Sequence, residues 1–117
     1  EYATCLPHTI GLKTTVDKAR QMMEQHHCHH LPVLEGGKLV GVISSSDLAR
    51  ANDDLAQVGD IMTDEPLIVS PGDRVKDVVG KMVKNSCNSA IVAAKGNSPW
   101  SIFTSVDAMK ILYEVMP

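Results

Sequence analysis

Apolar residues recur every three or four positions in two stretches of the chain, and this spacing predicts two amphipathic helices. The first stripe consists of Val16, Ala19, Met22, Met23 and His26, and the second of Val75, Val78, Val79, Met82 and Val83. We expect Thr14 to cap the first helix, with Asp17 three residues later completing a capping box.

Short apolar runs that follow each helix predict strands. Leu31 to Leu34 and Leu39 to Ile43 flank the turn signal Glu35-Gly36-Gly37-Lys38, so they are expected to form a hairpin that leads into a helix over 44–51. Ile10 and Leu12 suggest a short strand before the first helix, and residues 55–66 are a connector. The second half is predicted to contain strands at 67–69, 90–94 and 100–103, a turn at 95–99 and a final helix at 106–115.

The two halves repeat each other. Val16 aligns with Val75 and Cys28 with Cys87 at an offset of 59 residues, and one extra residue in the second turn aligns Asp47 with Asp107. Each half has the order β-α-β-β-α and cannot bury its sheet alone. We therefore predict a mixed α+β fold of two pseudo-symmetric repeats, residues 1–57 and 58–117, packed sheet to sheet around a pseudo-twofold axis.

Composition narrows the classes of function. The chain has 117 residues, 44% of them hydrophobic, and a net charge of −3 with both signs mixed along it, so no basic surface for nucleic acid or an anionic membrane is expected. No apolar run approaches the roughly 20 residues that span a bilayer. The three cysteines are widely spaced, which argues against a disulfide framework and favours the cytoplasm.

Two Ser/Thr-x-x-Asp tetrads lie where a predicted strand meets a predicted helix. They run from Ser44 to Asp47 and from Thr104 to Asp107. An aspartate at a helix start can accept both hydroxyls of a ribose, while the hydroxyl side chain and the N–H groups of the first turn can bind a phosphate. The same pattern is also a capping box that needs no ligand. Spacing alone leaves both interpretations open.

A basic residue follows each aspartate by three positions. Arg50 and Lys110 can approach a phosphate from the next helical turn, or each can form an i,i+3 ion pair with its own aspartate.

These segments, in this order, resemble a tandem pair of cystathionine-β-synthase-type (CBS) domains, also called a Bateman module. The matching segments are His30-Leu31-Pro32-Val33-Leu34, residues 39–48, Val58-Gly59-Asp60-Ile61-Met62-Thr63 and Val69-Ser70-Pro71. The second copy departs from the pattern, because Ser101 replaces Gly41 and Ile91 replaces Pro32. The resemblance is therefore more specific in the first repeat.

The resemblance implies a regulatory, energy-sensing module that is not an enzyme. It implies an adenosine-containing ligand, AMP-like first, with ADP, ATP or S-adenosylmethionine as alternatives, held in clefts between the repeats. It also implies a homodimer in the form of a four-domain disc, and a regulated enzyme or transporter as partner. The implied ligand-binding residues are Ser44, Asp47, Thr104, Asp107, Thr14, Cys28, His29, His30, Cys87, Asn88 and Ser89. Arg50 and Lys110, by their position after each aspartate, are the candidate phosphate contacts. Similar proteins that bind multiply charged nucleotides often carry a basic residue inside the turn, and neither tetrad has one, which argues against a triphosphate.

Three rival functions come from other classes. A ligand-free dimerisation module would use the tetrads only as caps. A metal-responsive module would use the tract His26-His27-Cys28-His29-His30, since imidazole and thiolate bind zinc and copper. Adjacent residues cannot all face one ion, however, so we expect no metal site. An independent enzyme is disfavoured, because the sequence has no Gly-x-Ser-x-Gly turn and no phosphate-binding glycine loop with lysine.

Overall fold

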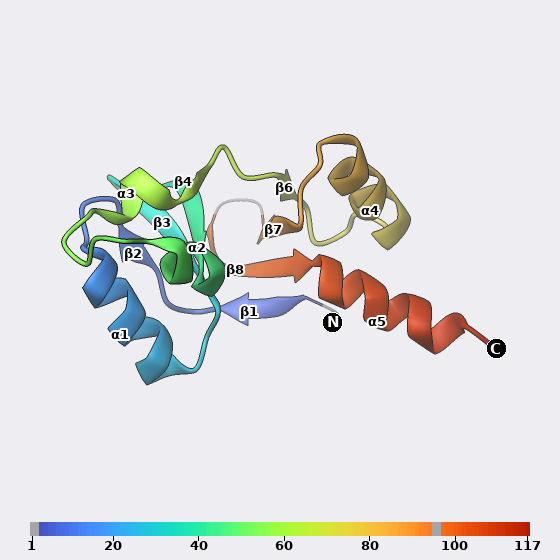
Figure 1. The fold of residues 1–117 in the computed structure, drawn as a ribbon. Helices are drawn as coiled ribbons and strands as arrows, with labels where there is room; N and C mark the ends of the chain where they lie inside the picture. The colour runs from blue at the N-terminus through green and yellow to red at the C-terminus, as the bar shows by residue number, and fades with distance from the viewer. Residues whose placement is uncertain (1–2, 95–96) are drawn as a thin grey trace. The chain divides into compact units, whose positions relative to one another are not determined.

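The computed structural model describes residues 3–94 and 97–117 of the chain (Figure 1). By its contacts the chain divides into two compact units. One unit is His8–Pro66, and the other is Leu67–Pro117 together with the segment that precedes His8. Each unit contains one four-stranded sheet, which confirms the predicted mixture of helices and strands.

The unit His8–Pro66 is built around the predicted hairpin. Its strands are β2 (Ile10–Gly11), β3 (His30–Glu35), β4 (Lys38–Ser44) and β5 (Thr63–Asp64), and its helices are α1 (Val16–His26), α2 (Ser45–Arg50) and α3 (Val58–Ile61). The sheet order is β2-β3-β4-β5, with β2 parallel to β3 and the other pairs antiparallel. Val16, Ala19 and Met23 of α1 pack in one core with Leu31 and Ile43.

The second unit repeats this plan. Its strands are β1 (Thr4–Leu6), β6 (Ile68–Val69), β7 (Ser89–Ala94) and β8 (Asn97–Thr104), and its helices are α4 (Val75–Lys84) and α5 (Ser105–Val115). The order is β1-β8-β7-β6, with β6 parallel to β7. Val78 and Met82 of α4 join Val69, Ala90 and Phe103 in its core. Part of the turn predicted at 95–99, residues 95 and 96, lies outside the described residues.

The first helix begins one residue later than predicted. Its N-cap is Thr15, whose Oγ1 accepts the N–H of Lys18 at 3.4 Å. Thr14 cannot take that role, because its backbone is engaged outside the helix: its N–H donates to the carbonyl of Gly11 (3.1 Å) and its carbonyl accepts the N–H of Val58 (2.7 Å). The cap predicted at Thr14 was therefore wrong by one position.

The connector predicted at 55–66 is more regular than the sequence suggested. It contains α3 and β5, and Val58 at the start of α3 is fully buried in the core of the first unit. β5 pairs with β4 through Thr63 and Val42. Because of these contacts, the boundary between the two compact units lies between Pro66 and Leu67. The sequence had predicted the boundary between the repeats nine residues earlier, between residues 57 and 58.

The N-terminal strand joins the sheet of the other repeat. β1 lies antiparallel to β8, with Thr4 opposite Ile102 and Leu6 opposite Trp100 (Figure 1). β5, which precedes the second repeat, likewise completes the sheet of the first. Each sheet thus receives its outer strand from the segment that leads into the other repeat. The sequence prediction, which grouped the N-terminal segment with residues 8–57, did not anticipate this exchange.

The apolar stripe of α4 is only partly buried. Val78 and Met82 are buried and Val79 is half-buried, whereas Val75 is 38% and Val83 is 74% exposed. The stripe correctly predicted a helix. It overstated the width of the face that packs against the core of this unit.

Candidate functional site

The first acidic turn joins β4 to α2. Ser44 Oγ accepts the N–H of Asp47 at 3.1 Å, and Asp47 Oδ2 accepts the N–H of Ser44 at 2.9 Å, which is a complete capping box. Asp47 Oδ1 accepts a hydrogen bond from Arg50 Nη2 at 2.8 Å. Both ligand-independent interpretations of these residues, the capping box and the i,i+3 ion pair, are therefore realised here.

The second acidic turn joins β8 to α5 and has the same box. Thr104 Oγ1 accepts the N–H of Asp107 at 3.3 Å, and Asp107 Oδ2 accepts the N–H of Thr104 at 2.8 Å and its hydroxyl at 3.1 Å. Asp107 is only 8% exposed. Within the described residues, Asp107 forms no ion pair with Lys110, so the two turns differ in charge compensation.

Each acidic turn lies beside the residues that lead into β3 or β7 and begin that strand. In the first unit His30 is paired with Ser44, and the N–H of Ser45 donates to the carbonyl of His29 at 2.9 Å. The second unit has the same arrangement. There Ser89 is paired with Thr104, and the N–H of Ser105 donates to the carbonyl of Asn88 at 2.8 Å.

The predicted site residues therefore gather into two groups, one in each unit. The first cluster is Cys28, His29, His30, Ser44, Asp47 and Arg50, and the second cluster is Cys87, Asn88, Ser89, Thr104, Asp107 and Lys110. In the first unit the cluster lies at the end of the hairpin opposite the turn at Gly36 and Gly37. Thr14 forms no described hydrogen bond with either cluster.

A left-handed residue turns the chain from helix into each cluster. His27 has a φ of 52° and Ser86 a φ of 55°, at equivalent positions of the two repeats. Immediately after them, the N–H of Cys28 donates to Met23 (3.1 Å) and the N–H of Cys87 to Met82 (2.8 Å), which closes the C-terminus of each helix. Burial raises the pKa of the Cys28 thiol, against a smaller lowering by the backbone of His30.

The histidine tract does not converge on one point. The ring of His26 stacks on that of His8, with centroids 3.6 Å apart and planes 17° from parallel. The described part of the chain holds no group of three or more His, Cys, Asp or Glu residues placed to bind a metal ion. Sequence reasoning did not identify His8, because no motif links it to a partner 18 positions away.

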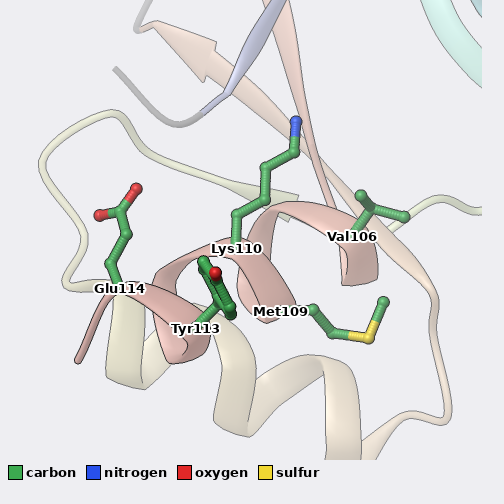
Figure 2. Close-up of a pocket in the computed structure, with 5 residues that line it drawn as sticks. All are labelled: Val106, Met109, Lys110, Tyr113 and Glu114. Atoms are coloured by element: carbon green, nitrogen blue, oxygen red, sulfur yellow. The ribbon is translucent and has the colours of Figure 1, made fainter. Parts of the chain in front are cut away.

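The sequence analysis also missed a surface pocket on α5. The pocket has a volume of about 410 Å³ and is lined by Val106, Met109, Lys110, Tyr113 and Glu114 (Figure 2). Val106 is 51%, Met109 59% and Tyr113 80% exposed, so α5 presents an apolar surface in this unit. The spacing of these residues, at i, i+3 and i+7, was the available signal. Among the described helices, none has the length and apolarity to cross a membrane.

Known proteins share both the sequence pattern and the fold. The chain is 38% identical to part of inosine-5′-monophosphate dehydrogenase from Korarchaeum cryptofilum, over 54% of this chain and 13% of that protein. It is 27% identical to the CBS domain pair of protein MJ0100, solved with 5′-methylthioadenosine and S-adenosyl-L-methionine, with a TM-score of 0.77 and 95% of both chains covered.

A third likeness is to the acetoin utilization protein AcuB from Vibrio cholerae, described in its structure as putative, with 25% identity, a TM-score of 0.71, and 97% of this chain and 88% of that one covered. The chain spans only 13% to 42% of the length of the curated relatives that it matches. The model of the CBS domain family matches residues 2–54 and again residues 58–114. With two matches that cover nearly all of its length and a solved CBS pair of the same fold, this chain belongs to the CBS domain family.

Proposed function

We propose that this chain is a regulatory, non-catalytic module that binds an adenosine-containing ligand in a cleft between its two repeats. An AMP-like ligand is proposed first, with ADP, ATP and S-adenosylmethionine as the alternatives. The observation that supports this proposal is the repeated juxtaposition of an acidic turn with the strand-entry residues, His30 opposite Ser44 and Ser89 opposite Thr104. The related MJ0100 pair, which was solved with two adenosine derivatives, supports the ligand class.

Each residue of the clusters has a proposed role. Asp47 and Asp107 accept the ribose hydroxyls, and Ser44 and Thr104 hold them in place through the capping boxes. Arg50 and Lys110 are the proposed phosphate contacts. The adenine would contact the short side chains and backbone of the strand-entry residues, which are Cys28, His29, His30, Cys87, Asn88 and Ser89. Thr14 is proposed to reach the ribose or phosphate.

The capping boxes leave acceptor capacity for a ribose. A carboxylate has about four lone-pair positions on its two oxygens. Asp47 uses one oxygen for the N–H of Ser44 and the other for Arg50, so each can still accept a further bond. Both described hydrogen bonds to the carboxylate of Asp107 use Oδ2, and none uses Oδ1. Every fully buried side-chain oxygen of the described residues has a hydrogen-bond partner. Asp107 Oδ1 is therefore not fully buried, and solvent can reach it.

The experiment that tests this function is calorimetry of the folded protein with AMP, ADP, ATP and S-adenosylmethionine. We expect heat with at least one of them, and Asp47→Asn should weaken that binding by about tenfold, as expected for a lost charged hydrogen bond. The amide oxygen of asparagine can still accept the N–H of Ser44, so the cap survives. Ligand at 100 times its Kd should also stabilise the protein by about 2.7 kcal/mol.

Asp60→Asn is the matched control. Asp60 Oδ2 accepts the N–H of Gln57 at 3.3 Å at the start of α3, so it is a capping contact of the same kind outside both clusters. This variant should bind like the wild type. Absence of heat with all four ligands, in protein whose circular dichroism shows it folded, would refute the proposed function.

The second candidate function is a dimerisation module without a ligand. Two observations favour it: both capping boxes are complete without a ligand, and α5 exposes Val106, Met109 and Tyr113. We propose that two copies associate through this surface as a homodimer, to regulate an attached or associated enzyme or transporter in the cytoplasm. Sedimentation with and without ligand separates the candidates, since a purely structural dimer does not respond to a nucleotide.

A further inference from the structure

The helix that follows the first acidic turn, α2, has few contacts that fix its direction. It has six residues, all of them described, and Leu48 is the one whose side chain is buried. A helix this short has little stability of its own and depends on contacts with the rest of the fold. The capping box of Ser44 and Asp47 fixes the start of α2, so its direction depends on what binds its other end.

Arg20 of α1 binds the C-terminal end of α2. Its Nη2 donates to the carbonyl of Leu48 at 2.7 Å and to that of Ala51 at 3.3 Å, and its Nη1 pairs with Asp54 in the segment after α2. The last carbonyls of a helix have no partner in the next turn, and a guanidinium offers five donors in one rigid plane. A single side chain therefore links α1 to the end of α2 and to the segment that follows it.

α1 is well placed to serve as the support for α2. The N–H of Val16 donates to the carbonyl of Ala56 at 2.8 Å, and the N–H of Asp17 donates to that of Asp54 at 3.1 Å, so the start of α1 is bonded to the segment after α2. Val16 is also fully buried in the core of this unit. The position of α1 is thus fixed by the core, and Arg20 transmits that position to α2.

The second repeat has a different residue at the equivalent position. At the repeat offset of 59 residues, Val79 of α4 corresponds to Arg20, and a valine side chain cannot donate to a carbonyl. The helix after the second acidic turn, α5, has 11 residues where α2 has six. The support through a guanidinium therefore belongs to the repeat with the shorter helix.

We propose that Arg20 is a positioning residue for the first acidic turn, which holds α2 in the orientation that directs the Asp47 carboxylate to the ligand. This inference rests on the proposed function, because it presumes that a ligand binds at this turn. It adds a residue that acts from behind the turn through α2 and does not contact the ligand. Without Arg20, α2 would occupy the competent orientation for only part of the time, and the apparent Kd would rise in inverse proportion to that fraction.

The test measures the Kd of AMP and of adenosine by calorimetry for the wild type and for Arg20→Met, which keeps most of the apolar stem and removes every donor. If the competent orientation falls to about 10–30% of the population, both probes should bind roughly three- to tenfold more weakly, by the same factor. A residue that contacted the phosphate would weaken the binding of AMP alone. Hydrogen exchange of the backbone amides of residues 45–51 should be faster in Arg20→Met, and AMP should slow it again.

Arg20→Lys keeps the charge but lacks the planar arrangement of donors that reaches both carbonyls. It should weaken the binding of both probes by a smaller common factor, and it provides the same comparison if Arg20→Met does not fold. Lys18→Met is the matched control, because Lys18 is an exposed cation of α1 whose ammonium forms no hydrogen bond or ion pair among the described residues. This variant should keep the affinities and the exchange rates of the wild type.

Two results would overturn the inference and leave the proposed function intact. The first is wild-type affinity for both probes in folded Arg20→Met, which would make Arg20 a purely structural residue. The second is a loss of affinity for AMP with that for adenosine unchanged, which would make Arg20 a ligand contact. Absence of binding of either probe to the folded wild type would instead refute the proposed function itself.

Discussion

Gly41 in β4 is the position where one added methyl group should cost the most. A Cβ on Gly41 would lie 2.5 Å from Met62 Sδ and 2.7 Å from the carbonyl oxygen of Thr63. The methionine side chain can rotate away. The Thr63 carbonyl cannot do so easily, because Thr63 and Asp64 form β5, which pairs with Val42 and Gly41. Overpacking of this kind costs about 1–3 kcal/mol, so Gly41→Ala should destabilise the protein by that amount.

Thermal unfolding followed by circular dichroism measures this effect, since each kcal/mol corresponds to a shift of roughly 4–8 °C in Tm for a domain near this size. Gly80→Ala is the control, because a Cβ at this exposed position in α4 meets nothing within 4 Å. It should raise stability by about 0.5–1 kcal/mol through helix propensity. The double variant Gly41→Ala, Met62→Ala should recover only part of the loss. A Tm for Gly41→Ala equal to that of the wild type, or full recovery in the double variant, would refute the steric reasoning.

Three further predictions concern stability and the reactivity of a thiol. Arg20→Ala should lower the free energy of unfolding in urea by about 1–2 kcal/mol, because its guanidinium pairs with Asp54 and donates to the carbonyls of Leu48 (2.7 Å) and Ala51 (3.3 Å); an unchanged midpoint would mean that water replaces these bonds. His27→Gly should raise the free energy of unfolding by about 0.5–1 kcal/mol, because the φ of 52° at this position strains a residue with a Cβ. Ser86→Gly should have the same effect for the same reason. A lower free energy of unfolding in either variant would contradict this explanation. Because burial raises the pKa of the Cys28 thiol, iodoacetamide should alkylate Cys28 more slowly than the exposed Cys5. The protein should also lose stability as alkaline pH ionises the Cys28 thiol. Equal alkylation rates of the two thiols, measured by mass spectrometry, would contradict the first expectation.

The sequence predicted the elements whose signals are local. The Ser/Thr-x-x-Asp tetrads specified where β4 and β8 end and predicted both capping boxes, because the contacts span only three residues. The Gly36-Gly37 turn predicted the first hairpin for the same reason, and both glycines have positive φ. The repeat offset predicted two pseudo-symmetric repeats, and the backbone contacts of the two clusters are equivalent.

Contacts between distant segments could not be predicted from one sequence. The pairing of β1 with β8 joins Thr4 to Ile102, and the 3 residues of β1 are too few to show a periodicity that identifies their partner. Arg20 is one of several charged residues on the polar face of α1, so its bonds to the end of α2 leave no local pattern. The difference between Arg50 and Lys110 depends on side-chain conformation, which identical i,i+3 spacing does not specify.

The exchange of outer strands has a consequence for the independence of the two repeats. A chain severed between residues 57 and 58 would give one fragment that keeps β1 without β8, and whose β4 has lost β5. The other fragment, residues 58–117, would lose the pairing of β8 with β1 and expose the backbone of β8 at the edge of the sheet. Such an unpaired edge can pair with strands of other molecules. A cut at that limit would therefore break both sheets, whereas a cut after Pro66 would leave β2, β3, β4 and β5 together in one contiguous piece.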